Sequence, residues 1–495
     1  MMNGTRRPTI YKANGQPYRA AEFSRFTSHL PSICRPTENE LTSTVLGVLR
    51  ARSRFIVKNH AHAAGAISLI TRRIVGAGMR IQARLKSVAG GFLRDENAAL
   101  ERIYHDFSRS GISPRGEKHQ AFWCKALRTR LIDGEVFLLK VAERGREPLA
   151  RSWQIIKGDQ IAEQETNRSA KGNKVSLGVE TNPAGRPVAY HIYRDGSTFG
   201  GFRQGAGKVE RVPADRVIHW YQSDNPDATR GVPLLTPVIL KLADLDEFAA
   251  STLTTAWSQS LTSAFITTPF PVEMMESRTA TADRDTTVTP ERWQEEMTAG
   301  VKEYLMPGES VEFADPKSPP QQFDAFTVAI LRSIACGIGL SYEGLARDWT
   351  RTNYSSGRMG MLEDRLMYRE FSGAMDETVI DPVWRDFIDQ VYFVGRLRDA
   401  PVDVVDLYAH RAQHPQPGWV DPLKEQQAWT EAVKNKIASR REACAERGRD
   451  FFDVADELAE EGVYLASKGL DVGIEGEPTD DRVLAKVYDR EEVAT

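Results

Sequence analysis

Two helical stretches that flank a compositionally different island constrain this fold more than any other feature of the sequence. The first lies within 234–266 and has no Gly or Pro after Pro237, and the second spans 321–338. Each carries apolar side chains at helical spacing along one face. The two faces comprise Val238, Leu242, Leu245, Ala249, Leu253 and Ala256 in the first, and Phe323, Phe326, Ile330 and Ile334 in the second. We expect the chain to run out along one helix and to return along the other.

The island between these helices, 267–320, has prolines towards both ends. It contains a polar loop, an amphipathic helical pattern in "ERWQEEMTAGVKEYL" and a short strand pattern in "ESVEFADP". Proline and clusters of polar turn residues interrupt regular structure. We therefore expect a small α/β unit at the tip of the helix pair.

A polar and cationic connector, 339–356, follows the second helix and includes "SYEGLARDWTRTNYSS". We expect this connector to be a loop, followed over 357–410 by a long helix and a returning segment. Pro382 should kink the long helix, because proline lacks the intrahelical N–H donor and clashes with the preceding turn. The rest of the chain predicts helices over 411–468 and an acidic tail over 469–495.

The part of the chain that precedes the helix pair is mixed in character. Residues 1–36 combine Arg, Pro, Gly and Ser without a clear period, so we expect an arm that is ordered only by its neighbours. Thr37 and Glu40 form a capping-box pattern at the start of one long predicted helix. From about 134 to 222, alternating segments and a turn signal at 182–185 predict a block of antiparallel strands.

A basic stripe on this first helix consists of Arg50, Arg54 and Lys58, which recur every four residues. Such a stripe is most often a solvated face, and this is the interpretation that we favour. The alternative is a contact with nucleic acid or with an acidic neighbour.

Charge is unevenly distributed, although the net charge is only -3. Residues 1–150 contain 26 Lys and Arg against 12 Asp and Glu, whereas residues 451–495 contain 4 against 13. Affinity for nucleic acid depends on how many phosphates a protein neutralises, and acidic parts repel them. We therefore expect any DNA contact to be local or imposed by geometry.

Compartment and metal content follow from the apolar runs and the cysteines. Runs such as "VLGVL" are far shorter than the roughly 20 residues that span a bilayer, and the first residues lack the apolar stretch of a signal peptide. We expect a soluble protein that is not exported. Four cysteines, Cys34, Cys124, Cys336 and Cys444, have no paired spacing, which favours free structural thiols in a reducing compartment.

Known catalytic motifs match this sequence poorly. "GAGK" at 205–208 lacks the first glycine and the final hydroxyl of a phosphate loop, and "VGAG" at 75–78 follows a predicted helix instead of a strand. His60 and His62 are two apart in the first predicted helix and should point to different faces, which argues against joint metal ligation. We expect no catalytic site, no metal site and no cofactor.

Several motifs along the chain resemble those of the portal proteins of tailed bacteriophages, specifically the lambda-like portal family. Their order and spacing carry the resemblance, which leaves out only the first 35 residues and the acidic tail. The motifs are "RARSRFIVKNHAHAAGAISLITRRIVGAGMRIQAR", "TRLIDGEVFLL", "VPADRVIHWY", "TRGVPLLTPVILKLADLDEFAASTL", "LMPGESVEFADP", "YEGLARDWTRTNYSSGRMGMLEDR" and "HPQPGWVDPLKEQQAW".

This resemblance implies an α+β portal fold, assembled as a ring of usually twelve subunits at one capsid vertex. Each subunit of such a ring has a wing, a two-helix stem, a clip and a crown. The implied segments are an N-terminal arm (1–36), the wing (37–233), the first stem helix (234–266), the clip (267–320), the second stem helix (321–338), the channel loop (339–356), the long wing helix and return (357–410), the helical crown (411–468) and the acidic tail (469–495).

The resemblance also implies a function and a set of partners. Double-stranded DNA would be packaged and ejected through the ring, the terminase large subunit would dock during packaging, and head–tail connector or adaptor proteins would dock afterwards. The ring would contact the major capsid protein and a scaffold or maturation protease, and would nucleate procapsid assembly. Its place would be the unique vertex of the virion after assembly in the host cytoplasm, with no membrane partner.

Two sets of candidate site residues follow from the resemblance. The residues facing DNA would be Arg347, Arg351, Asn353, Ser355, Ser356 and Arg358, and the docking surface of the clip would be Trp293, Glu295 and Glu296. Plainer interpretations exist for both sets. Arg358 belongs to the first turn of a helix capped by Ser355, or Arg347 and Arg351 pair with acidic residues of an adjacent subunit. Trp293 packs within the ring of clips itself.

Two functions from other classes stay open from the residues alone. One is a packaging enzyme that processes DNA, which would require a nucleotide or metal site. The other is a monomeric virion adaptor that binds other structural proteins without forming a channel.

Overall fold

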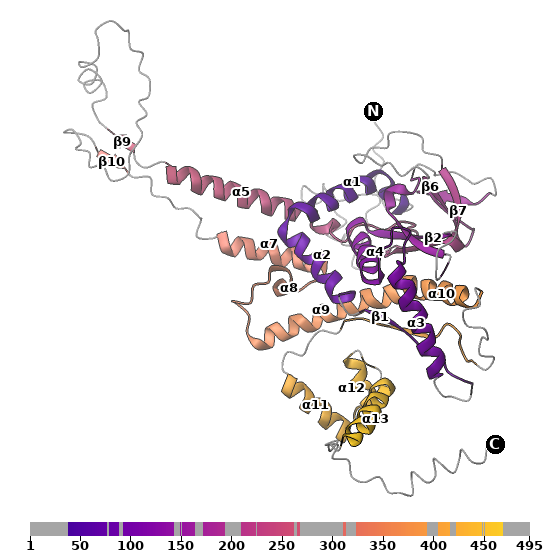
Figure 1. Cartoon of the computed structure of the whole chain (residues 1–495). Helices are drawn as coiled ribbons and strands as arrows, with labels where there is room; N and C mark the ends of the chain where they lie inside the picture. Colours follow the sequence, from indigo (N-terminus) through magenta and orange to yellow (C-terminus); the bar gives the residue numbers. More distant parts are fainter. Residues whose placement is uncertain are drawn as a thin grey trace, which may run out of the picture.

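A mixed α+β body, two projecting helices and a separate group of C-terminal helices make up the computed structural model (Figure 1). No described helix is both long and apolar enough to cross a membrane. The structure describes residues 38–76, 79–88, 93–142, 149, 151–163, 172–193, 209–223, 225–261, 265–267, 310–312, 323–393, 404–415, 422–447, 449 and 451–468.

The first predicted helix is two helices in the structure, α1 (Glu38–Asn59) and α2 (Ala61–Ile74). The break lies at His60, whose ring nitrogen Nδ1 accepts a hydrogen bond from the His62 N–H at 3.2 Å and caps α2. The two imidazole rings are therefore neighbours, with centroids 5.5 Å apart, so our expectation that they point to different faces is wrong. No group of side chains suited to a metal ion occurs among the described residues.

Two antiparallel sheets occupy the predicted strand block. The first has the order β3 (Arg151–Ile156), β2 (Glu135–Ala142) and β8 (Val217–Tyr221). The second has the order β4 (Lys174–Ser176), β5 (Val179–Thr181), β6 (Pro187–Tyr193) and β7 (Val209–Pro213). Short 3-10 helices cover Gly158–Gln160, Ala214–Arg216 and Thr236–Val238. The prediction of antiparallel strands over this region is confirmed.

A large apolar core joins the helices of the body to the first sheet. It contains Ile67 and Ile70 of α2, Trp123 of α4 (His119–Asp133), and Trp384 and Phe387 further along the chain. Helix α3 (Arg94–Ser110) contributes to the same core, next to the two-stranded sheet of β1 (Arg80–Ala83) and β11 (His410–Gln413). A smaller core lies between the two larger sheets and includes Phe137, Tyr190 and Val212.

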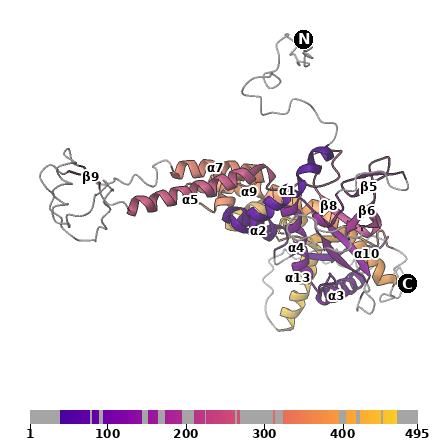
Figure 2. The same ribbon diagram turned by 90° about the horizontal axis from the view of Figure 1, so that it is seen from above.

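The predicted out-and-back pair is present as α5 (Ile239–Leu261) and α7 (Phe323–Ile338), which project together from the body (Figures 1 and 2). At their far end, β9 (Phe265–Thr267) and β10 (Ser310–Glu312) pair as a short antiparallel ladder. The out-and-back course is therefore confirmed for α5, β9, β10 and α7.

The predicted apolar seam between α5 and α7 is only partly correct. Near the body, Leu242 and Leu245 are buried, and further out Phe248 stacks on Phe323 with ring centroids 5.4 Å apart. Beyond this point Leu253 is 72% exposed. The reason is length: α5 has 23 residues and α7 has 16, so α5 is about 10 Å longer at 1.5 Å per residue. On α7, Ile334 is buried as predicted but Phe326 is 48% exposed.

After α7 the chain forms α8 (Tyr342–Ala346), α9 (Tyr354–Met375), a π-helical turn (Asp376–Ile380) and α10 (Asp381–Phe393). A π turn, which ends two residues before Pro382, lies where we predicted a kink. Helices α11 (Pro422–Lys434), α12 (Arg440–Glu446) and α13 (Phe451–Ser467) form the separate C-terminal group below α9 in Figure 1.

Candidate functional site

The connector between α7 and α9 is more ordered than the predicted loop. Helix α8 occupies its first part, and α9 already begins at Tyr354, so Ser355 and Ser356 belong to a helical turn. Only 347–353 lies between the two helices. The prediction that 339–356 is a loop throughout is therefore wrong, because two caps within it start helices.

The first of these caps is Ser341, which anchors α8 to α9. The Ser341 side chain accepts a hydrogen bond from the Gly344 N–H at 3.1 Å, while its own N–H and hydroxyl donate to the Asp364 carboxylate at 2.6 and 2.7 Å. A Cβ on Gly344 would lie 2.7 Å from Asp364 Oδ2, so a larger residue there would have to displace the Asp364 carboxylate from Ser341. Burial raises the pKa of the Asp364 carboxyl, against the two Ser341 hydrogen bonds that lower it.

The second cap is Asn353, whose side-chain oxygen accepts a hydrogen bond from the Ser356 N–H at 2.9 Å. The alternative interpretation, in which Ser355 caps this helix, is therefore wrong. Ser355 is exposed in the first turn, and the Ser356 hydroxyl lies 3.0 Å from Asn353 Oδ1. Both residue types favour N-cap positions, and the capping side chain is the one whose backbone is still extended.

The three candidate arginines of the connector have different surroundings. Arg347 ends α8 in the left-handed conformation with φ of 56°, and its side chain is exposed. Arg351 forms an ion pair with Asp324 in the first turn of α7. Arg358 is exposed on α9. Neither Arg347 nor Arg358 forms an ion pair with any residue that the structure describes.

Asp348 organises the turn between these arginines. Its carboxylate accepts hydrogen bonds from the Thr350 N–H at 3.0 Å, the Thr350 hydroxyl at 2.6 Å and the Tyr342 hydroxyl at 2.9 Å. The Thr350 hydrogen bonds lower the pKa of Asp348, so this carboxylate acts as a charged acceptor in a fixed turn. The turn thus presents guanidinium groups to solvent from a hydrogen-bonded backbone. Among its described residues, no two side chains are arranged as a general acid and a general base.

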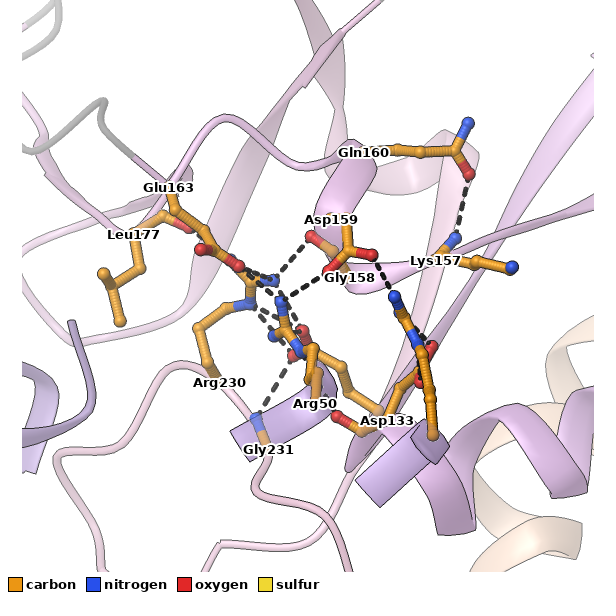
Figure 3. A network of polar contacts seen from close by, with 12 residues as sticks. Arg50, Asp133, Lys157, Gly158, Asp159, Gln160, Glu163, Leu177, Arg230 and Gly231 are labelled. Atoms are coloured by element: carbon orange, nitrogen blue, oxygen red, sulfur yellow. Dashed lines mark hydrogen bonds and ion pairs between the residues drawn. The ribbon is translucent and has the colours of Figure 1, made fainter. Parts of the chain in front are cut away.

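A buried network of charged side chains fixes the root of the projecting helices (Figure 3). At its centre, the fully buried Glu135 lies 2.5 Å from Nη2 of Arg50 and 2.5 Å from Nη2 of Arg230. Its other oxygen accepts a hydrogen bond from the Gly231 N–H at 3.2 Å. The same oxygen lies 3.1 Å from Nε2 of His219. Burial alone would raise the pKa of Glu135, but Arg230 and Arg50 hold it well below its usual range.

The network extends along α1 and corrects our interpretation of the basic stripe. Arg50 is fully buried and also contacts Glu163, while Arg54 lies 2.6 Å from Asp133 and also contacts Asp159. Two of the three stripe residues therefore face acidic neighbours within the same chain. Lys58 alone has the solvated position that we favoured for all three.

Two of the motifs quoted above meet at this network. "LIDGEV" supplies Asp133 and Glu135, and "TRGVP" supplies Arg230 immediately before the helix pair. Gly134 has φ of +90°, and a Cβ there would lie 2.3 Å from the Val232 carbonyl carbon, so the two segments cross in direct contact. A sequence signal for this contact existed: Glu135 is a lone carboxylate at the start of a strand whose next four residues are apolar. Nothing in the sequence indicated that its partner is Arg230, 95 residues away.

The candidate docking residues Trp293, Glu295 and Glu296 lie outside the described residues, as do the N-terminal arm and the acidic tail. Sequence reasoning also missed Asp324 and Asp364. Each is an acidic residue in a helix with an apolar face, where a solvated position is the ordinary expectation.

Comparison with known proteins gives one family and several relatives. The family described as "Phage portal protein, lambda family" matches residues 35–371. The "Probable portal protein" of Halomonas phage phiHAP-1 is 24% identical over 417 residues, which cover 83% of this chain and 79% of the relative. "Portal protein B" of Escherichia phage lambda is 21% identical over 462 residues, which cover 85% and 84% of the two chains.

Solved structures that resemble this chain include chains of gene transfer agent (GTA) particles. A chain in the neck of an empty GTA particle, computed with C6 symmetry, is 16% identical with a TM-score of 0.42, covering 86% of this chain and 99% of that one. A chain in the virion of a native GTA particle is 15% identical with a TM-score of 0.40, covering 84% and 94%.

Proposed function

This chain belongs to the lambda family of phage portal proteins, and on that premise we propose that it forms a ring at one capsid vertex through which double-stranded DNA is packaged and ejected. In this proposal the ring has about twelve subunits, the number that the family resemblance implies, and it repeats one heterologous interface around the ring. The protein is a structural channel and docking component of the virion, with no reaction of its own.

The observation that carries the proposal is the out-and-back pair of α5 and α7, joined at its inner end to the connector. We assign the pair as the stem, the residues between the two helices as the clip, α9 and α10 with the sheets as the wing, and the C-terminal helices as the crown. The connector from Arg347 to Asn353 then becomes the channel loop.

DNA must slide through a channel of this kind, so strong phosphate contacts would act as barriers. The connector suits that requirement, because each subunit offers a few exposed guanidinium groups. Its ion pair between Arg351 and Asp324 is exposed on both sides, 47% and 68%, and exposed pairs typically stabilise by only about 0–1 kcal/mol. Repeated around a ring, such weak contacts would form a cationic collar that steadies DNA without gripping it.

The surroundings of the connector support a fixed collar. The Ser341–Asp364 hydrogen bonds hold α8 to α9, and the Glu135 network holds the root of α5 to the body. Ser355, Ser356 and Asn353 add neutral donors and acceptors near the arginines. A rigid frame keeps the arginines of all subunits at one height, which a flexible loop would not.

The clip is the proposed docking site for the terminase large subunit during packaging and for head–tail connector proteins afterwards. Trp293, Glu295 and Glu296 are our candidate residues there, because aromatic side chains often dominate docking surfaces. The proposed partners also include the major capsid protein and a scaffold or maturation protease. We further propose that the ring nucleates procapsid assembly.

Electron microscopy of the purified chain tests this function directly. We expect closed rings with a central hole, and a mass from light scattering close to a whole multiple of the subunit mass. Dispersed single subunits at all concentrations would instead support a monomeric adaptor. Magnesium-dependent nuclease or ATPase activity that persists after contaminating enzymes have been removed would support a packaging enzyme. It would contradict the proposal.

A further inference from the structure

The break between α1 and α2 places a buried imidazole beside the root of α5 (Figure 1). His60 occupies this break with an extended backbone, and its side chain is only 3% exposed. Two other titratable groups face its ring. The His62 ring lies 5.5 Å away between centroids, and the Asp246 carboxylate of α5 lies 3.5 Å from Nε2. We call these three residues the junction cluster.

The two ring nitrogens of His60 have different roles. Nδ1 accepts the hydrogen bond from the His62 N–H at 3.2 Å, which satisfies one of the free donors at the start of α2. Nδ1 therefore carries no proton, and the neutral ring holds its single proton on Nε2. Nε2 is buried and forms no hydrogen bond of ordinary geometry with any described residue, although it faces Asp246.

A second proton can therefore enter the His60 ring only at Nδ1, where it would point at the His62 N–H. Two donors would then face each other, and α2 would lose its cap. The added charge is nearly neutral for the helix ends, because position 60 lies at the C-terminus of α1, which favours a cation, and at the N-terminus of α2, which disfavours it. Protonation of His60 therefore removes the cap and strengthens the attraction to Asp246 of α5.

Other charged groups on the helices around the break do not compensate for the lost cap. On α2 itself, Arg72 and Arg73 lie in the last turn, and α9 brings Asp364 near Arg73 at that far end. The remaining charged side chains are exposed or have other partners: Lys58 of α1; Lys241, Asp244 and Glu247 of α5; and Lys125, Arg128, Arg130 and Asp133 of α4. Besides the junction cluster, the Leu242 carbonyl of α5 faces the ring.

Burial determines the direction of the pH effect. It lowers the pKa of His60, and the Asp246 carboxylate only partly opposes this. Burial also lowers the pKa of His62, which a charge on His60 lowers further. An unfolded histidine has a pKa of about 6.5, so the unfolded segment binds protons first. Stabilisation by the neutral ring is therefore complete above that value and is lost as pH falls below it.

We propose that His60 is a pH-sensitive hinge between α1 and α2. A proton on Nδ1 removes the cap and opens the first turn of α2, while the ring stays paired with Asp246 of α5. All groups of this hinge lie within one chain, so the proposal does not depend on ring assembly.

Amide hydrogen exchange of the full chain, read by mass spectrometry, tests the proposal. Peptides over 62–66 report the first turn of α2, and peptides over 242–248 report the facing part of α5. Exchange of the same peptides in the urea-unfolded chain corrects for the chemical effect of pH. Between about pH 7.5 and about pH 5, we expect protection over 62–66 to fall by about fivefold, the usual effect of losing a helix cap. Protection over 242–248 should not change.

Two variants separate the cap from the second imidazole. His60→Asn keeps a capping oxygen that does not titrate, so protection over 62–66 should no longer depend on pH. His62→Gln keeps the backbone N–H that needs the cap, so the dependence should persist. Equal dependence in His60→Asn and in the original chain would overturn the proposal, as would its loss in His62→Gln.

Titration of the ring in the original chain decides the matter even if a variant misfolds. Slow deuterium exchange at the imidazole carbon, assigned to His60 by fragmentation of its peptide, gives the midpoint of protonation. We expect this midpoint to lie below about 6.5 and to coincide with the midpoint for loss of protection over 62–66. Midpoints more than about one pH unit apart, protection that does not change with pH, or equal losses over 62–66 and 242–248 would each contradict the hinge.

Discussion

Glu135 is the residue on which the junction between the body and the projecting helices depends. It is a fully buried carboxylate held between the guanidinium groups of Arg50 and Arg230. Buried ion pairs lose hydration on both partners, so their net stabilisation is small while they are intact. Removal of one partner is different, because it leaves a charge buried without compensation.

Arg230→Ala tests this balance. The variant leaves Glu135 with less positive charge and also removes hydrogen bonds to the carbonyl groups of Leu177 and Gly158. We expect the free energy of unfolding to fall by about 3–5 kcal/mol, the usual cost of breaking a buried pair from one side. Urea-induced unfolding, followed by circular dichroism, measures the change.

Arg186→Ala is the control for this substitution, because Arg186 is exposed in the turn between β5 and β6. Its free energy of unfolding should stay within about 0.5 kcal/mol of the original, as for most surface changes. Equal effects at the two positions would show that the buried network contributes nothing specific.

At the scale of elements, His414 joins three parts of the body: the end of α2, the π turn and β11. Its ring lies 2.7 Å from the Ile74 carbonyl at the end of α2 and 2.8 Å from Oδ1 of Asp376 in the π turn, and it follows β11 directly. Burial alone would lower the pKa of His414, but Asp376 and the Ile74 carbonyl raise it. The protonated ring therefore stabilises the folded chain.

The sign of the pH dependence follows from that raised pKa. Stabilisation by His414 is fully present below the unfolded histidine pKa of about 6.5, and it is lost as pH rises through the higher folded value. We expect His414→Gln to destabilise the chain by on the order of 1 kcal/mol at low pH and by less at high pH. Urea unfolding of both proteins across this range measures the difference.

His105→Gln provides the comparison, since His105 is exposed on α3. A destabilisation by His414→Gln that does not change with pH would contradict a charged His414 and leave only its neutral hydrogen bonds.

The connector is the element with the most direct bearing on DNA. Arg347→Ala, Arg351→Ala and Arg358→Ala together remove the proposed collar. Ring assembly and stability should change little. Arg347 and Arg358 pair with no described residue, and Arg351 has only an exposed ion pair. Alanine and arginine have a similar cost in the left-handed conformation at 347. We expect lower packaged genome yield or greater genome leakage.

Packaging assays with the triple variant, beside the original chain, measure this effect. Lys58→Ala is a suitable control, because Lys58 is an exposed cation on α1. Unchanged yield and retention in the triple variant would mean that the connector arginines do not contact DNA.

Elements differed in how far the sequence could predict them. Periodicity located α5 and α7, because their apolar residues recur over several turns. The cap of α9 was misplaced by two residues, since Asn353 and Ser355 are both good caps and backbone geometry chooses between them. The break at His60 was missed because no Gly or Pro marks it, and only its ring nitrogen satisfies the freed N–H.

At the scale of the whole molecule, the sequence predicted segments better than contacts. The order of body, projecting helices and C-terminal helices follows from local patterns and from the resemblance. The meeting of Glu135 with Arg230, and of Arg351 with Asp324, depends on how distant segments cross in space, which no local pattern encodes. Those crossings decide which arginines are free for other partners.

The C-terminal helices give the last test, because they form a group apart from the body in Figure 1. None of the side chains that the structure describes in α11, α12 and α13 is buried, and the large core ends with residues before 415. A chain that ends after Pro415 keeps every described core residue and the His414 contacts. Its body should therefore unfold within about 1 kcal/mol of the full chain, as measured by urea unfolding at equal concentration.

A chain that ends after Lys468 is the control for this truncation, since it lacks only the acidic tail. If the shorter chain unfolds far more easily than this control, the C-terminal helices stabilise the body through contacts beyond those described. If the two agree, those helices depend on other molecules for their own cover, because exposed apolar residues such as Ile437 and Tyr464 find none within the described part of the chain.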